Sequence, residues 1–162
     1  MDTLRIRDAT HDDLEFLACG NESMARETEH RTLDPRTVRR GVEAVLADPA
    51  RGRYFVAVDE SGAALGQLMV TYEWSDWRDG QFWWLQSVYV LPRARRRGVF
   101  KALYDHVDAL ARSTPGVCGL RLYVELDNLA AQRTYERCGM RDASYRVMEI
   151  DRSRTIRATP ED

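Results

Sequence analysis

A change of hydrophobic period after residue 91 constrains the fold of this chain most. Residues 85–91 are mostly apolar or β-branched, which is typical of a strand buried on both faces. Pro92 ends that strand because proline has no N–H for a central ladder. Beyond it the period becomes helical, with apolar residues at Val99, Leu103, Val107 and Leu110. The pattern therefore predicts a strand, a short loop and a helix.

The predicted loop is strongly basic, with arginine at positions 93, 95, 96 and 97 before Gly98. A loop that enters a helix presents backbone N–H groups without intrahelical partners, and the helix dipole adds partial positive charge. This arrangement suits a phosphate group. The absence of a following Gly-Lys-Ser/Thr excludes a P-loop, and the single glycine excludes a dinucleotide fingerprint. The alternative is an ordinary turn with a solvated arginine cluster.

Composition limits the classes of function. The 162 residues suffice for one domain with a real core, and we expect residues 1–162 to form a single domain. A net charge of −2 argues against a nucleic-acid or membrane partner, and no apolar run approaches the roughly 18 residues of a membrane span. The start of the chain lacks a signal-peptide pattern, so we expect a cytoplasmic protein. The three cysteines and three histidines are scattered, which predicts buried thiols and no metal site.

Hydrophobic patterning assigns the other elements. Strands are expected at residues 3–7, 53–59, 65–72, 82–91, 117–125 and 145–150, and helices at 10–25, 34–46, 99–112 and 128–138. The strands at 53–59 and 65–72 should pair as a hairpin, because a Glu-Ser-Gly turn separates them. Residues 82–125 should form a strand–helix–strand unit with parallel strands. The whole predicts an α/β (α+β) mixed sheet with helices on its faces.

Two motifs occur in a fixed order along this pattern. The first is Val88-Tyr89-Val90-Leu91-Pro92 followed by Arg95-Arg96-Arg97-Gly98-Val99-Phe100, and the second is Asn128-x-x-Ala131-x-x-x-Tyr135-x-x-x-Gly139-Met140. Together they resemble the GNAT superfamily of acyl-CoA-dependent N-acetyltransferases, over roughly residues 3–150. The chain departs from the family pattern twice: Arg96 replaces a common glycine, and Phe100 replaces the usual small residue.

The resemblance implies a GNAT-like single domain whose two central parallel strands splay apart to admit acetyl-CoA as cosubstrate. Backbone groups of Val88, Tyr89 and Val90 would bind the pantetheine arm. No metal is implied. Backbone N–H groups along the basic loop would hold the pyrophosphate, namely those of Arg95, Arg96, Arg97, Gly98, Val99, Phe100 and Lys101.

The resemblance also names candidates for catalysis. Tyr135 would be the general acid that protonates the leaving thiolate, and a core tyrosine is the alternative. Asn128 would contact the cofactor or cap its own helix. Glu73 is the candidate general base working through water, with Glu125 as a second choice. The four tryptophans at 74, 77, 83 and 84 would line an acceptor pocket or serve the core.

The implied function is transfer of an acetyl group from acetyl-CoA to a primary amine of a small molecule or peptide. The alternative from another class is a non-catalytic acyl-CoA-binding module. A nucleic-acid-binding protein that uses Arg93 to Arg97 is disfavoured by the net acidity and the lack of a wider basic stripe. Aromatic content and the family's habit favour a homodimer.

Overall fold

Five strands form a mixed sheet in the order β1-β3-β4-β5-β6. The computed structural model describes residues 4–152 and 156–158. The strand bounds are β1 (Arg5–Asp8), β3 (Arg53–Val58), β4 (Ala64–Ser75), β5 (Gly80–Val90) and β6 (Val117–Leu122). Neighbouring strands from β1 to β5 are antiparallel, and β5 and β6 are parallel. The mixed sheet, the β3–β4 hairpin and the parallel β5–β6 pair are all confirmed as the sequence predicted.

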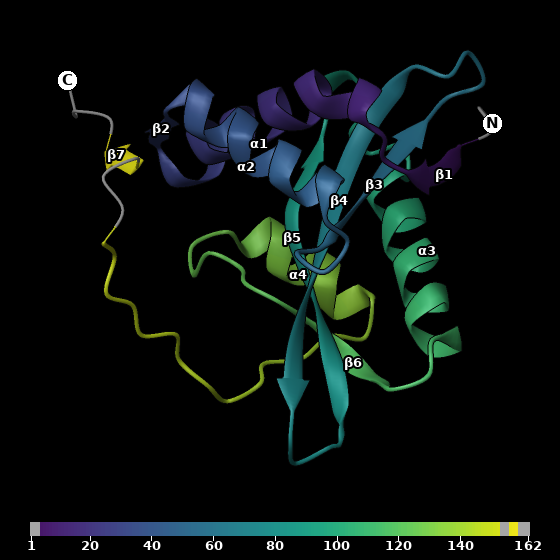
Figure 1. The fold of residues 1–162 in the computed structure, drawn as a ribbon, viewed down its shortest axis with the longest axis vertical. Helices are drawn as coiled ribbons and strands as arrows, with labels where there is room; N and C mark the ends of the chain where they lie inside the picture. Colours follow the sequence, from purple (N-terminus) through teal and green to yellow (C-terminus); the bar gives the residue numbers. More distant parts are fainter. Residues whose placement is uncertain (1–3, 153–155, 159–162) are drawn as a thin grey trace.

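Helices cover both faces of this sheet (Figure 1). The elements α1 (Leu14–Glu29) and α2 (Pro35–Ala47) pack on one face, and α3 (Val99–Ser113) packs on the other. Each face has its own core, centred on fully buried side chains such as Leu17 and Val56 on the α1–α2 side and Phe55 and Leu103 on the α3 side. The helix α4 (Leu129–Arg137) lies beside α3, where Tyr104 donates a hydrogen bond to the carbonyl of Cys138 at 3.2 Å.

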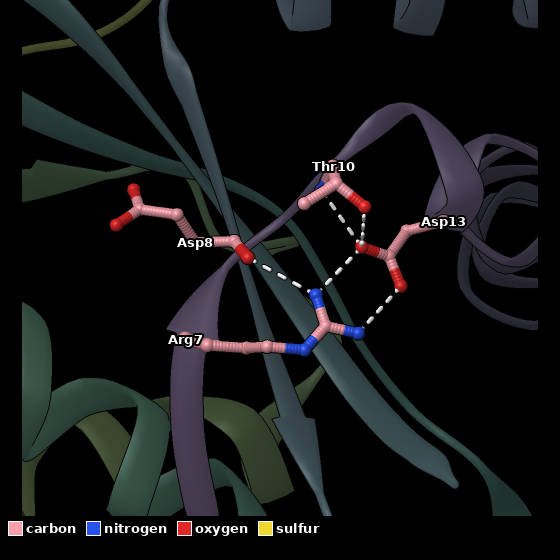
Figure 2. A network of polar contacts seen from close by, with 4 residues as sticks. All are labelled: Arg7, Asp8, Thr10 and Asp13. Atoms are coloured by element: carbon pink, nitrogen blue, oxygen red, sulfur yellow. Dashed lines mark hydrogen bonds and ion pairs between the residues drawn. The ribbon is translucent and has the colours of Figure 1, made fainter. Parts of the chain in front are cut away.

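The entry into α1 is fixed by a carboxylate that collects four hydrogen bonds (Figure 2). Asp13 ends the short 3-10 turn η1 (His11–Asp13) and is almost completely buried. Its oxygens accept from Arg7 Nη1 and Nη2 at 2.7 and 2.8 Å, from the backbone N–H of Thr10 at 2.8 Å, and from the Thr10 hydroxyl at 3.4 Å. The contact ties β1 to α1. The sequence predicts the Thr10 start but not the partnership with Arg7.

Two irregularities shape the middle of β5. Opposite Leu68 of β4 the strand carries one extra residue, because the register runs from Gln67↔Tyr89 to Met69↔Gln86. Ser87 lies in this bulge with a φ of 50°. The parallel pairing with β6 ends at Leu85↔Leu122, while β5 continues to Val90. Among the described residues, 86–90 therefore have no parallel neighbour, which agrees with the opening of the central strands that the family resemblance implies.

The predicted strand at Tyr145–Ile150 is wrong. Residues 141–152 form no helix or strand, and several apolar side chains there are exposed, up to 94% for Met148. Instead, the short strand β7 (Ile156–Ala158) pairs antiparallel with β2 (Arg31–Leu33), which the pattern did not predict (Figure 1). A segment with alternating apolar residues forms a strand only where another strand is free to pair with it. Residues 141–152 form no such pairing with the described residues. Among the described residues, no helix is long and apolar enough to span a membrane.

Candidate functional site

The basic loop joins β5 to α3 and is held at both ends by buried residues. Ala94, in the turn η2 (Pro92–Ala94), and Val99, at the start of α3, are both almost inaccessible, whereas residues 95–98 between them are exposed. Arg96 and Gly98 both have positive φ, 61° and 82°. The loop thus takes the left-handed conformation at position 96 even though arginine stands there. This explains how the chain tolerates its departure from glycine, at a cost of about 1–2 kcal/mol.

The first turn of α3 supplies unpaired backbone donors beside this loop. The first donor within the helix is Ala102, which bonds the Gly98 carbonyl at 2.9 Å. The N–H groups from Gly98 to Lys101 therefore lie outside the helix ladder, where they and the dipole suit an anion. The N–H of Arg95 differs, because it donates to Pro92 O at 3.3 Å. Arg95 therefore does not offer its N–H to a pyrophosphate while η2 persists.

The strand edge next to the loop turns backbone groups toward the opening. The N–H of Leu91 donates to Leu65 O at 2.9 Å, so the alternation along the strand points the polar groups of Val90 away from β4. The side chains of Val88 and Val90 pack against the α3-side core. Tyr89 points to the opposite face, where its hydroxyl donates to Glu27 of α1 at 2.9 Å. The predicted cofactor residues thus divide between the two faces of one strand.

Arg95 closes this edge with its side chain. Its Nε donates to the Val90 carbonyl at 3.0 Å, and its Nη2 bonds Glu27 at 2.5 Å. Its guanidinium also lies 5.5 Å from the centre of the Tyr89 ring. Burial works against a charged Glu27, but the hydrogen bonds from Arg95 and Tyr89 outweigh it and lower the pKa of that carboxyl. The network connects α1 to the loop. Its residues come from segments far apart in the sequence, so the local sequence pattern could not predict it.

Tyr135 of α4 lies next to the first turn of α3. Its ring meets the ring of Phe100 edge to face, with centroids 5.5 Å apart. Burial raises the pKa of the Tyr135 hydroxyl, with a smaller contribution from Cys138, so the hydroxyl remains protonated at neutral pH. Phe100, the second departure from the family pattern, thus packs against the ring of Tyr135. Asn128 caps α4, because its Oδ1 accepts from the N–H of Ala131 at 3.1 Å.

Glu73 lies on β4, away from the bulge. It pairs with Phe82 in the sheet, four positions beyond the Met69↔Gln86 pair, which is about 13 Å along the strand. Its carboxylate accepts from Arg121 Nη1 at 2.8 Å and from the indole N–H of Trp84. Arg121 in turn lies 3.7 Å from the centre of the Phe82 ring. Glu125, the second candidate, is exposed beyond the end of β6.

The tryptophans do not form one pocket. Trp83 is buried on the α3 side against Tyr72, and Trp84 stacks on Tyr123 with ring centroids 4.4 Å apart. Trp74 and Trp77 near the β4–β5 turn are 60% and 84% exposed. Trp74 and Trp77 do line one pocket together with Glu73, whereas the other two tryptophans lie outside it. The prediction is therefore wrong only for a pocket that all four share.

The cysteines differ in exposure from what the sequence predicted. The prediction of buried cysteines is wrong for Cys19 and Cys118, which are exposed, while Cys138 is half-buried. Within residues 4–152 and 156–158, no cluster of three or more histidine, cysteine or acidic side chains could hold a metal ion.

Comparisons with known proteins agree with this geometry. The family model of the acetyltransferase (GNAT) family matches residues 14–140. A possible acetyltransferase from Clostridium difficile 630 has a similar structure, with 40% identity, a TM-score of 0.85, and coverage of 91% of this chain and 97% of that one. An aminoglycoside N-acetyltransferase in complex with CoA shares the fold at 18% identity and a TM-score of 0.73, over 94% of this chain and 97% of that one.

A sequence relative is the mycothiol acetyltransferase of Mycolicibacterium gilvum, 31% identical over 83% of this chain and 45% of that protein. The chain therefore spans less than half the length of this relative. The family model covers both motifs, the opened strand pair and the basic loop. On these grounds the chain belongs to the GNAT family of acetyltransferases.

Proposed function

We propose that the protein transfers an acetyl group from acetyl-CoA to a primary amine of a small molecule or peptide. One observation carries the proposal: β5 loses its parallel neighbour after Leu85 just before it enters the basic loop. An open strand edge suits an extended chain with amide groups, and the adjoining helix start suits a diphosphate. Acetyl-CoA combines these two features and, when bound, supplies an activated thioester.

The residues near the opening fit such a cosubstrate. The N–H groups from Gly98 to Lys101 would hold the pyrophosphate, and the charges of Arg96 and Arg97 would support them. Backbone groups at Val88 and Val90 would bind the pantetheine arm. Arg95 would release the Val90 carbonyl as that arm arrives, because its Nε bonds this oxygen in the structure.

For the chemistry, we assign Tyr135 as the donor of a proton to the leaving sulfur. The hydroxyl is protonated at neutral pH because burial raises its pKa. Glu73 remains our candidate for the base that takes the proton of the amine. About 13 Å of strand separates it from the bulge, so a chain of several waters would have to relay that proton. Asn128 would support this site by starting α4.

The alternative is an acyl-CoA-binding module without transferase activity.

We also propose that the protein is a homodimer. This proposal rests on two features at the β6 side of the molecule. β6 pairs with β5 along one edge and, among the described residues, with no strand along the other. The apolar side chains at 145–150 are exposed.

Purified protein tested with acetyl-CoA separates the two functions. Binding should raise the melting temperature, since a ligand at one hundred times its Kd adds about 2.7 kcal/mol of stability. Acetylated pantetheine lacks the pyrophosphate and should stabilise the protein much less at equal concentration. Release of thiol with a panel of amines then establishes transfer. A binding module would show the shift without thiol release, and no shift at saturating acetyl-CoA would overturn both functions.

A further inference from the structure

A cavity of about 290 Å³ lies between the sheet and the helices α1 and α2. Its size is near the lower end of the range for small-molecule sites, roughly 300–1,000 Å³. The walls come from α1, α2, β2 and three strands of the sheet. Most of the lining side chains are aliphatic or thioether groups: Met24, Leu33, Val38, Val42, Val45 and Met69. Among the described residues, none that lines the cavity is acidic or basic.

The few polar groups of the cavity are largely bonded to one another. Asn21 donates from Nδ2 to the Tyr54 hydroxyl at 3.0 Å and accepts from Gln67 Nε2 at 2.8 Å. Gln67 is fully buried behind this wall. Burial raises the pKa of Tyr54, which therefore keeps its proton. A molecule in the cavity would meet a small polar floor at Tyr54 and Ser87 and apolar walls everywhere else.

The position of the cavity connects it to the proposed chemistry. Ser87 lines it and is the bulge residue of β5 with positive φ. Val88 is the next residue, where the strand edge proposed for the cofactor begins. An acceptor that fills the cavity would thus have one end beside the acetyl group. Strand bulges occur often beside active sites, where they redirect a side chain or end the pairing.

The lining also sets the chemistry of the acceptor. A polycation would place further ammonium groups among the apolar walls without a charged partner, which is unfavourable, whereas a single amine at the bulge leaves only the tail in the cavity. A sugar would leave most of its hydroxyl groups without hydrogen bonds. An aliphatic or aromatic group would bury apolar surface, and Met24 and Met69 could adjust to its shape.

We propose that the acceptor is a primary amine with an apolar tail, and that this cavity holds the tail while the amine lies at the Ser87 bulge. This inference rests on the proposed acetyl transfer and names its substrate class. Specificity would come from the shape and apolar lining of the α1–α2 side, with Tyr54 as the hydrogen-bond donor at its floor.

Calorimetry with the protein saturated with CoA tests the cavity without relying on turnover. The probes are 3-methylbutylamine and 2-phenylethylamine as apolar amines, and glucosamine and spermidine as polar ones. We expect the apolar amines to bind at least tenfold more tightly than the polar ones. Equal or tighter binding of glucosamine or spermidine would overturn the inference, as would undetectable binding of both apolar amines.

A substitution at the mouth of the cavity provides a second test of the inference. Gly41 of α2 lines the cavity, and a Cβ placed there meets no atom within 4 Å, so a side chain can start at this position and Gly41→Phe adds a ring at the mouth. The matched control is Ala44→Phe, on the same helix at an exposed position outside the lining. We expect Gly41→Phe to weaken binding of the apolar amines at least tenfold relative to Ala44→Phe, with similar melting temperatures. Equal affinities in the two variants would place the amines elsewhere.

The CoA titration that precedes these measurements keeps the two proposals distinct. If CoA and acetyl-CoA both fail to stabilise the protein, the proposed transferase function is wrong. If they stabilise it and the apolar amines do not bind, only the assignment of the acceptor is wrong.

Discussion

At the scale of single residues, the hydroxyl of Tyr135 is the group whose removal is most informative. Tyr135→Phe keeps the ring and its contact with Phe100 and removes only the proton donor. If the hydroxyl protonates the leaving sulfur, turnover should fall on the order of 10²-fold, and the Michaelis constant for acetyl-CoA should change little. Steady-state thiol-release kinetics would measure both constants.

The matched control for that change is Tyr104→Phe. Its hydroxyl bonds the Cys138 carbonyl at 3.2 Å, so its loss should cost about 1 kcal/mol of unfolding free energy and leave turnover unchanged. Undiminished turnover of Tyr135→Phe would remove this tyrosine from the mechanism and leave water as the proton donor.

The carboxylate of Asp13 predicts a pH dependence of stability. The hydrogen bonds from Arg7 lower its pKa, and those from Thr10 add to the effect. The folded state therefore gains stability above the unfolded pKa of about 3.9, and loses it as the pH falls through the lower folded value. At pH 7, Asp13→Asn should reduce the free energy of unfolding by about 1–3 kcal/mol.

Urea denaturation at pH 7 and pH 3 would test this dependence, because the gap between wild type and Asp13→Asn should shrink in acid. Asp12→Asn is the control, since its side chain is exposed and its change should stay within about 0.5 kcal/mol at both pH values. A gap that persists undiminished at pH 3 would show that the charge of Asp13 is not the cause.

The residues that the sequence predicted well are those whose role depends on neighbours along the chain. Asp34 caps α2 through the N–H of Thr37 at 2.9 Å, as expected, and Asn128 caps α4, which is one of the two roles considered for it. The bond from Arg95 to Val90 and the pairing of Glu73 with Arg121 were not predicted. They join segments brought together only by the fold, so local pattern carries no signal for them.

At the scale of elements, the helix start at Gly98 decides how the proposed pyrophosphate binds. Its φ of 82° is strained for any other residue, so every substitution there loses stability. Gly98→Gln and Gly98→Glu share this strain and nearly the same size, and they differ only by a negative charge. Gly98→Glu should therefore raise the Michaelis constant for acetyl-CoA well beyond the value of Gly98→Gln, because like charges repel. Equal constants would place the phosphates elsewhere.

Long elements were predicted from the sequence, whereas the three-residue strands and the bulge were not. Each strand of the main sheet and the four helices were expected close to their observed bounds, because their apolar residues recur at the period of the element that they form. The strands β2 and β7, three residues each, are too short to show a period. The bulge at Ser87 was also missed, since an extra residue in one strand becomes visible only against its partner.

At the scale of the whole molecule, the proposed homodimer rests on the edge of β6 and the exposed segment that follows α4. The segment 141–152 runs away from the sheet (Figure 1), and Tyr145, Val147, Met148 and Ile150 on it are 67–94% exposed. The open edge of β6 presents backbone N–H and C=O groups that can pair with another strand. The exposed segment has strand-like alternation, so its own backbone could form that strand. Pairing between the segment of one copy and β6 of another would satisfy both.

Val147→Pro tests that pairing directly. Proline removes one backbone donor from the middle of the segment, whereas the matched Val147→Thr keeps the donor and the β-branched shape. Light scattering coupled to size-exclusion chromatography should find wild type and Val147→Thr as dimers at micromolar concentration, and Val147→Pro shifted toward the monomer. The melting temperature of the dimers should rise with protein concentration, because association stabilises the folded state by mass action. A wild-type protein that is monomeric at every concentration measured would exclude the pairing, and a dimer unchanged by Val147→Pro would place the interface on another surface.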